Sequence, residues 1–121
     1  METKFNSQIC TSREQSERLL ALGLKKETAD SMHYHCWTPE DGIVDDIPAW
    51  SLHRLIEMIP EEIDRYFCTS FLTLSKYNVY YNESVDGAPD MEFEKNNLYE
   101  SILNCIEWLI KEGYFPKEYL V

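Results

Sequence analysis

The sequence predicts one α+β domain, in which a small antiparallel sheet of two to three strands packs with three main helices. Apolar residues recur at helical spacing in three separate segments, and the aromatic, β-rich stretch 66–82 lies between the second and the third of them. The length of 121 residues suits a single domain spanning 1–121. With 44% hydrophobic residues, the chain can bury a core without disulfides or metals.

The first helix is expected to follow an N-terminal arm at 1–10. A capping box is predicted, with Thr11 as the N-cap and Glu14 at N3, so that each side chain satisfies an otherwise unpaired backbone N–H. The helix then runs to about Leu22, and Gly23 suits the left-handed position that follows it.

A short helical turn is expected over 28–32, followed by the first strand. The alternating, aromatic-rich segment 33–38 predicts this strand, which Pro39 ends. Residues 40–46 are expected to form an acidic loop that turns at Gly42.

The second helix is expected to begin at Asp46 or Ile47. Pro48 would then occupy its first turn, where a missing N–H costs nothing. Pro60 ends the helix near its last apolar residue. The apolar stripe has the spacing i, i+3, i+4, i+7 and consists of Leu52, Leu55, Ile56 and Ile59.

Two strands are predicted in the β-rich part, over 66–74 and 77–81, with a turn at 75–78. No Asn-Gly or Asp-Gly fixes that turn, so a single bent strand remains an alternative. Alternation places two sets of side chains on opposite faces of the second strand. The more apolar set should face the helices and consists of Tyr77, Val79 and Tyr81; the open-face set consists of Asn78, Tyr80 and Asn82.

The last helix has the clearest pattern. Asn96 or Asn97 can cap its start, and Gly113 is the natural residue after its end. The apolar tail 114–121 is expected to fold back on the domain. The stripe of this helix consists of Leu98, Ile102, Cys105, Ile106 and Leu109.

The charge balance excludes direct binding of nucleic acid. The chain holds 22 acids and 11 bases, for a net charge of −11, and its largest basic cluster is Lys25-Lys26. Eight acids fall in 40–64 and six in 83–100. They indicate either a solvated face or an acidic surface that mimics DNA or docks a basic partner. No apolar run approaches the roughly 20 residues of a membrane span, and no signal peptide opens the chain, so a cytoplasmic location is expected.

Metal and catalytic sites are weakly indicated. His33 and His35 share one face of the predicted strand and are the best metal candidates, but His53 or an acid of 40–46 would have to supply a third ligand. No motif marks a catalytic residue or a cofactor site. The cysteines form no CxxC pair and are expected to be reduced, with Cys105 buried; they are Cys10, Cys36, Cys68 and Cys105.

Two stretches carry a resemblance. The first is Thr11-Ser12-x-Glu14-Gln15-Ser16-x-x-Leu19-x-x-Leu22-Gly23-Leu24 with Thr28-Ala29-Asp30, and the second is Asp46-Ile47-Pro48-Ala49-Trp50-Ser51-Leu52-x-x-Leu55 ending in Pro60. Together they resemble a family of small uncharacterised proteins encoded by gut Bacteroides-type bacteria, often within prophages and other mobile elements. The resemblance implies a cytoplasmic accessory protein and supplies no catalytic residues.

The favoured function is a non-enzymatic module that binds a protein partner or a second copy of itself. Twelve of the 16 aromatic residues lie in 61–121, more than a small domain readily buries, and exposed tyrosines are favoured at interfaces. Trp50 is expected in the core, which leaves Tyr80, Asn78 and Asn82 as the predicted interaction residues. The alternatives are a small enzyme or metal-dependent protein that uses His33 and His35, and an acidic inhibitor of a DNA-binding protein.

Overall fold

The computed structural model describes residues 8–33, 36–38, 42–44, 47–65, 68–82 and 91–121. Within them it has three α-helices, two short 3-10 helices and eight strands. In chain order these are α1 (Arg13–Leu22), η1 (Lys26–Thr28), β1 (Ser31–His33), β2 (Cys36–Thr38), β3 (Gly42–Val44), β4 (Ile47–Ala49), α2 (Leu52–Met58), β5 (Glu62–Arg65), β6 (Cys68–Leu74), β7 (Asn78–Asn82), β8 (Met91–Glu94), α3 (Leu98–Glu112) and η2 (Lys117–Tyr119).

The main sheet is antiparallel, with strand order β5-β6-β7-β8, so the predicted α+β class is confirmed with four strands in place of two to three. The connection between β6 and β7 is a hairpin and not a bend in one strand. Ser75 donates its N–H to the carbonyl of Asn78 at 2.9 Å, and Thr73 lies opposite Tyr80 in the register. Two further two-stranded ribbons pair β1 with β4 and β2 with β3.

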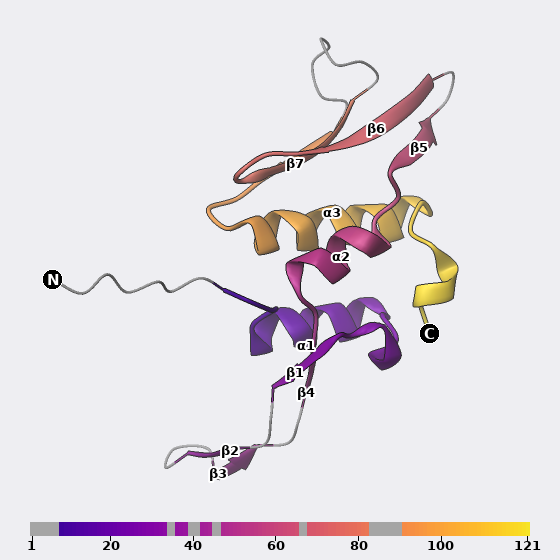
Figure 1. The fold of residues 1–121 in the computed structure, drawn as a ribbon. Coiled ribbons are helices and arrows are strands. Elements are labelled where there is room, and N and C mark those ends of the chain that lie inside the picture. Colours follow the sequence, from indigo (N-terminus) through magenta and orange to yellow (C-terminus); the bar gives the residue numbers. More distant parts are fainter. Residues whose placement is uncertain (1–7, 34–35, 39–41, 45–46, 66–67, 83–90) are drawn as a thin grey trace, which may run out of the picture.

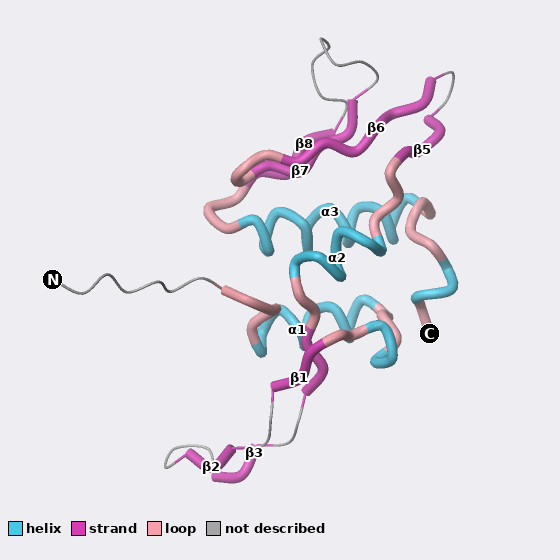
Figure 2. The backbone as a smooth tube through the Cα atoms, in the orientation of Figure 1, coloured by secondary structure: helices cyan, strands magenta, loops and turns pink. Residues whose placement is uncertain are grey.

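The elements stack in layers (Figure 1, Figure 2). Helix α3 packs against β7 and β8, with α2 beside it, and α1 contacts α3 on the side away from the sheet. The core lies between these layers, and its central side chains are fully buried: Val79, Tyr81, Ile102, Ile106 and Leu109. Among the described helices, none is both long and apolar enough to cross a bilayer.

The capping box of α1 lies one residue later than predicted. Ser12 is the N-cap and exchanges hydrogen bonds with Gln15 at N3. Thr11 is instead fully buried, where its hydroxyl pairs with Ser16 at 2.8 Å and accepts the N–H of Trp50 at 3.0 Å. Two neighbouring hydroxyls can both cap a helix, and only the tertiary contact with Trp50 decides between them. The end of the helix at Gly23, with φ of 105°, confirms the prediction.

The predicted start of the second helix is wrong. Residues Ile47–Ala49 form β4, which pairs with β1, and α2 begins at Leu52 behind Ser51 as its N-cap. Ser51 caps the helix because its hydroxyl accepts the N–H of Arg54, whereas Ile47 and Pro48, expected at the helix start, are held in the pairing with β1. Asp30 holds Ser51 in place by accepting its N–H at 2.8 Å. The end of α2 just before Pro60 agrees with the prediction.

Three further predictions in the N-terminal half are also wrong. The helical turn expected over 28–32 is η1 followed by β1. The described residues of the single strand expected over 33–38 belong to two strands in different sheets, β1 and β2, and Gly42 begins β3 where a loop was expected; 34–35, 40–41 and 45–46 lie outside the described residues. The short edge strands β5 and β8 were not predicted. Each of these elements has only three or four residues, which is too few to show an apolar period in the sequence.

The C-terminal third confirms its prediction. Asn97 caps α3 through its side chain, which accepts the N–H of Tyr99 at 2.7 Å, and Gly113 follows with φ of 81°. The tail folds back: Phe115 is buried, and Leu120 forms an isolated β-bridge with Leu24.

Candidate functional site

The face of the main sheet that points away from α3, called the outer face below, contains the predicted interaction residues. Val79 and Tyr81 are fully buried toward α3, so the alternate positions of β7 point the other way. Side chains paired directly across strands share a face, which extends the outer face to both neighbours of β7. From the register, its members are Glu62, Asp64, Thr69, Phe71, Thr73, Asn78, Tyr80, Asn82, Glu92 and Glu94.

Tyr80 lies in the middle of the outer face, between Thr73 of β6 and Glu92 of β8. It is partly exposed, as is Asn78, whose amide donates to Glu92 Oε1 at 2.9 Å. Asn82 is only 7% exposed and accepts a hydrogen bond from Thr73 Oγ1 at 3.3 Å. Asn78 and Tyr80 are therefore the accessible members of the predicted set. Tyr77, expected to face the helices, precedes β7 and is 45% exposed.

Both edges of the sheet carry acids at equivalent positions. Leu72 donates its N–H to the carbonyl of Glu61, and Ser75 donates to Asn78. Successive residues of a strand direct their backbone N–H and C=O groups to opposite sides. Counting along the strands from these two hydrogen bonds shows which residues of β5 and β8 direct these groups away from the sheet. Those residues are Glu62 and Asp64 on β5 and Glu92 and Glu94 on β8, and all four are exposed. Charged edges of one sign oppose pairing with another acidic strand.

The histidine candidates are not brought into a metal site among the described residues. His33 is the last residue of β1, and His35 lies outside the described residues. His53, the suggested third ligand, is on the exposed side of α2, with its Nε2 3.1 Å from Glu57 Oε1. Across the part of the chain that the structure describes, no three His, Cys, Asp or Glu side chains cluster closely enough to hold a metal ion.

Cys105 confirms the expected burial, and it has a testable consequence. Burial raises the pKa of its thiol to about 12, so the nucleophilic thiolate is scarce at neutral pH. We expect thiol titration of the native protein to leave Cys105 unmodified, and titration in denaturant to modify it. Mass spectrometry of the labelled peptides separates it from Cys10, which is partly exposed. Rapid native labelling of Cys105 would contradict its place in the core.

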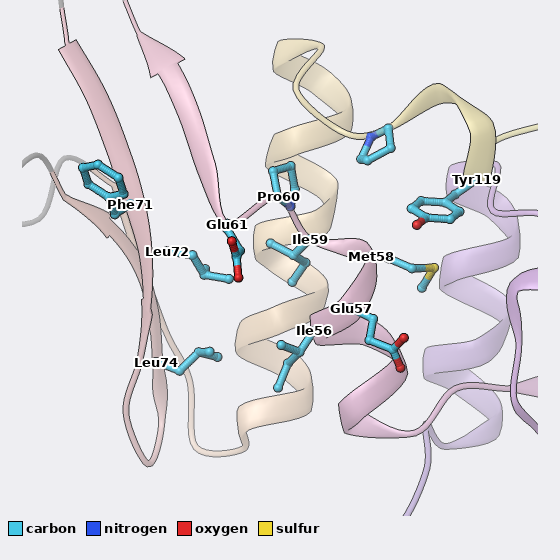
Figure 3. A pocket seen from close by; sticks show the side chains of 11 residues that line it. Ile56, Glu57, Met58, Ile59, Pro60, Glu61, Phe71, Leu72, Leu74 and Tyr119 are labelled. Carbon is cyan, nitrogen blue, oxygen red and sulfur yellow. The ribbon is translucent and has the colours of Figure 1, made fainter.

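A groove that the sequence did not reveal lies between α2 and the main sheet. Figure 3 shows Leu72 and Leu74 of β6 on one side, and Ile56 of α2 and Ile59 just after that helix on the other. The groove has a volume of about 830 Å³ and also reaches Tyr119 of the C-terminal segment. The apolar spacing that includes Ile56 and Ile59 predicted only that these residues face the core, and it gave no sign of a groove beside them. Only the packing of α3 under β7 and β8 leaves the inner side of β6 partly uncovered.

The walls of this groove are fixed by hydrogen bonds. Tyr81 donates its hydroxyl to the carbonyl of Pro60 at 2.8 Å, and the carbonyl of Glu61 accepts from Leu72 at 2.7 Å. On the far side, Lys25 donates its N–H to the carbonyl of Tyr119 at 2.9 Å. The groove is therefore formed before any ligand arrives.

Comparison with protein-family models, with curated proteins and with solved structures found no match. The resemblance carried by residues 11–60 thus stays a prediction.

Proposed function

We propose that the protein is a small, non-enzymatic accessory module that binds a basic surface of another protein through its outer face. The observation that supports this is the arrangement around Tyr80, where a partly exposed aromatic ring lies between two edges that carry exposed carboxylates. Phe71 adds a second aromatic side chain, 48% exposed, on the same face. A cytoplasmic location and an origin in a prophage or mobile element belong to the same proposal.

A different protein fits this face better than a second copy of the chain. Aromatic side chains supply large contact area at low entropic cost, whereas the surrounding carboxylates select the partner by charge. A second copy would place like charges edge to edge, because the chain has twice as many acids as bases. We therefore favour a partner that presents Lys or Arg around an apolar centre.

The acids also support a second candidate function, inhibition of a DNA-binding protein. The outward-facing acids come in pairs on both edges, and such a surface competes with phosphates for a basic groove. Competition between this protein and duplex DNA for the captured partner would establish this function. Simultaneous binding of both would exclude it.

Tyr80→Ala tests the proposal. We expect its unfolding midpoint to stay close to that of the wild type, because the ring is not part of the core, and its affinity for the partner to fall by about 1–3 kcal/mol. The partner is first captured from the native host and identified, and then its affinity is measured by titration calorimetry with each purified variant.

Tyr77→Ala is the matched control, since it removes an exposed tyrosine that lies at the hairpin and outside the outer face. It should leave the affinity unchanged. Equal losses of affinity in Tyr80→Ala and Tyr77→Ala would indicate that the partner contacts the hairpin and not the centre of the outer face. Unchanged affinity in Tyr80→Ala would refute binding through the outer face, and lost stability would assign Tyr80 to the core.

A further inference from the structure

We propose that the groove between α2 and β6 is a second binding site, which takes an extended apolar segment of a partner protein that carries Lys or Arg beside its apolar residues. The groove opens on the inner side of β6, where Leu72 and Leu74 alternate with the outer-face residues, and it meets the outer face at Phe71, which also lines it. The inference stands independently of the proposed function.

The lining of the groove suits a peptide better than a small metabolite. Its volume of about 830 Å³ falls within the range of about 300–1,000 Å³ typical of ligand pockets. Its opposing walls, however, are apolar: Ile56 and Ile59 face Leu72 and Leu74 (Figure 3). A small polar molecule needs several converging polar groups to orient it. The apolar anchor side chains of a peptide need only a pocket of complementary shape from which water is excluded.

The open edge of β6 favours an extended segment. Strand β5 pairs with β6 only over Cys68–Phe71, and the last cross-strand bond joins Leu72 to Glu61. By alternation, Leu74 turns its N–H and C=O to the side that β5 has left. Ile59, which would lie opposite Leu74, donates its own N–H to Ile56 at 3.2 Å. A peptide entering the groove can therefore pair with Leu74 as an added strand does.

The charge at the rim selects a basic segment. Glu61 is exposed, and among the described residues it forms no ion pair; the acidic Glu62 follows it. Glu57, also at the rim, is already paired with His53 and Arg54. No Lys or Arg lines the groove among the described residues. Lys or Arg beside the apolar anchors would meet the free carboxylate of Glu61, and a second copy of this acidic chain would bring repulsion.

A display library of random peptides tests the inference. Peptides are selected on the wild-type protein and counter-selected on Leu74→Asp, which places a charge in the wall at a position that is 37% exposed. We expect the surviving peptides to combine apolar residues with Lys or Arg. If Leu74→Asp does not fold, Ile56→Ser at the opposite wall takes its place.

The best peptide is then titrated against charge variants. Glu61→Lys should weaken it about tenfold, whereas the matched Glu94→Lys, which makes the same charge change on the far edge of the sheet, should change its affinity less than about twofold. Equal weakening by both variants, or selected peptides without basic residues, would overturn the inference, as would the loss of every wild-type binder in the counter-selection on Leu74→Asp. Tyr80→Ala should bind the selected peptide with wild-type affinity. A failure of the outer-face proposal therefore leaves the result for the groove unchanged.

Discussion

Trp50→Ala should destabilise the protein by about 3–5 kcal/mol, the range for removing a large aromatic side chain from a core. The Trp50 ring is fully buried, and its Nε1 donates to Thr28 Oγ1 at 2.9 Å. Its backbone also joins the start of α1, since Thr11 donates its N–H to the Trp50 carbonyl at 2.8 Å. The residue thus connects α1, η1 and α2 at one point. Chemical denaturation followed by circular dichroism measures the loss.

Trp50→Phe separates packing from hydrogen bonding. It keeps an aromatic ring and removes the bond to Thr28, whose hydroxyl still donates to the carbonyl of Lys25 at 2.6 Å. We therefore expect a clearly smaller loss than in Trp50→Ala. An unchanged denaturation midpoint in Trp50→Ala would mean that the ring is not in the core and would restore Trp50 as a candidate partner anchor.

Tyr81→Ala should cost a similar amount, about 3–5 kcal/mol of unfolding free energy. Its ring is fully buried between the sheet and α3, with its centroid 6.3 Å from that of Trp108. Its neighbour Tyr80 points to the opposite face of the same strand. Adjacent tyrosines should therefore give opposite results: Tyr81→Ala loses stability, and Tyr80→Ala keeps stability and loses partner affinity. The two variants are compared by denaturant titration under identical conditions.

Tyr81→Phe isolates the hydroxyl, which donates to the carbonyl of Pro60. Its loss should be about 0.5–1.5 kcal/mol, the usual net value of one hydrogen bond. Similar losses in Tyr80→Ala and Tyr81→Ala would contradict the exposed position of Tyr80, because its ring would then belong to the core as well.

Part of the candidate site followed from sequence, and part did not. Alternation along β7 was enough to place Val79 and Tyr81 inward and Tyr80 outward. It did not predict that Asn82 is almost fully buried, because that depends on neighbouring strands and not on the strand itself. The groove also escaped prediction, since periodicity marks Ile56 and Leu72 as apolar positions without saying which element covers them.

The α+β class and the helices α1 and α3 with their C-terminal glycines could be predicted from the residues alone, whereas the sequence left open whether 66–82 forms a hairpin or one bent strand. These features depend on local signals, namely apolar period, caps and turns, that neighbouring residues supply. The strand at Ile47–Ala49 and the two outer strands β5 and β8 became visible only in the folded protein. Such short segments have too few residues to show a pattern of their own, so their pairing with other strands decides their conformation. The outer face depends on the pairing of all four strands, and the groove depends on how α2 and the C-terminal segment pack beside β6.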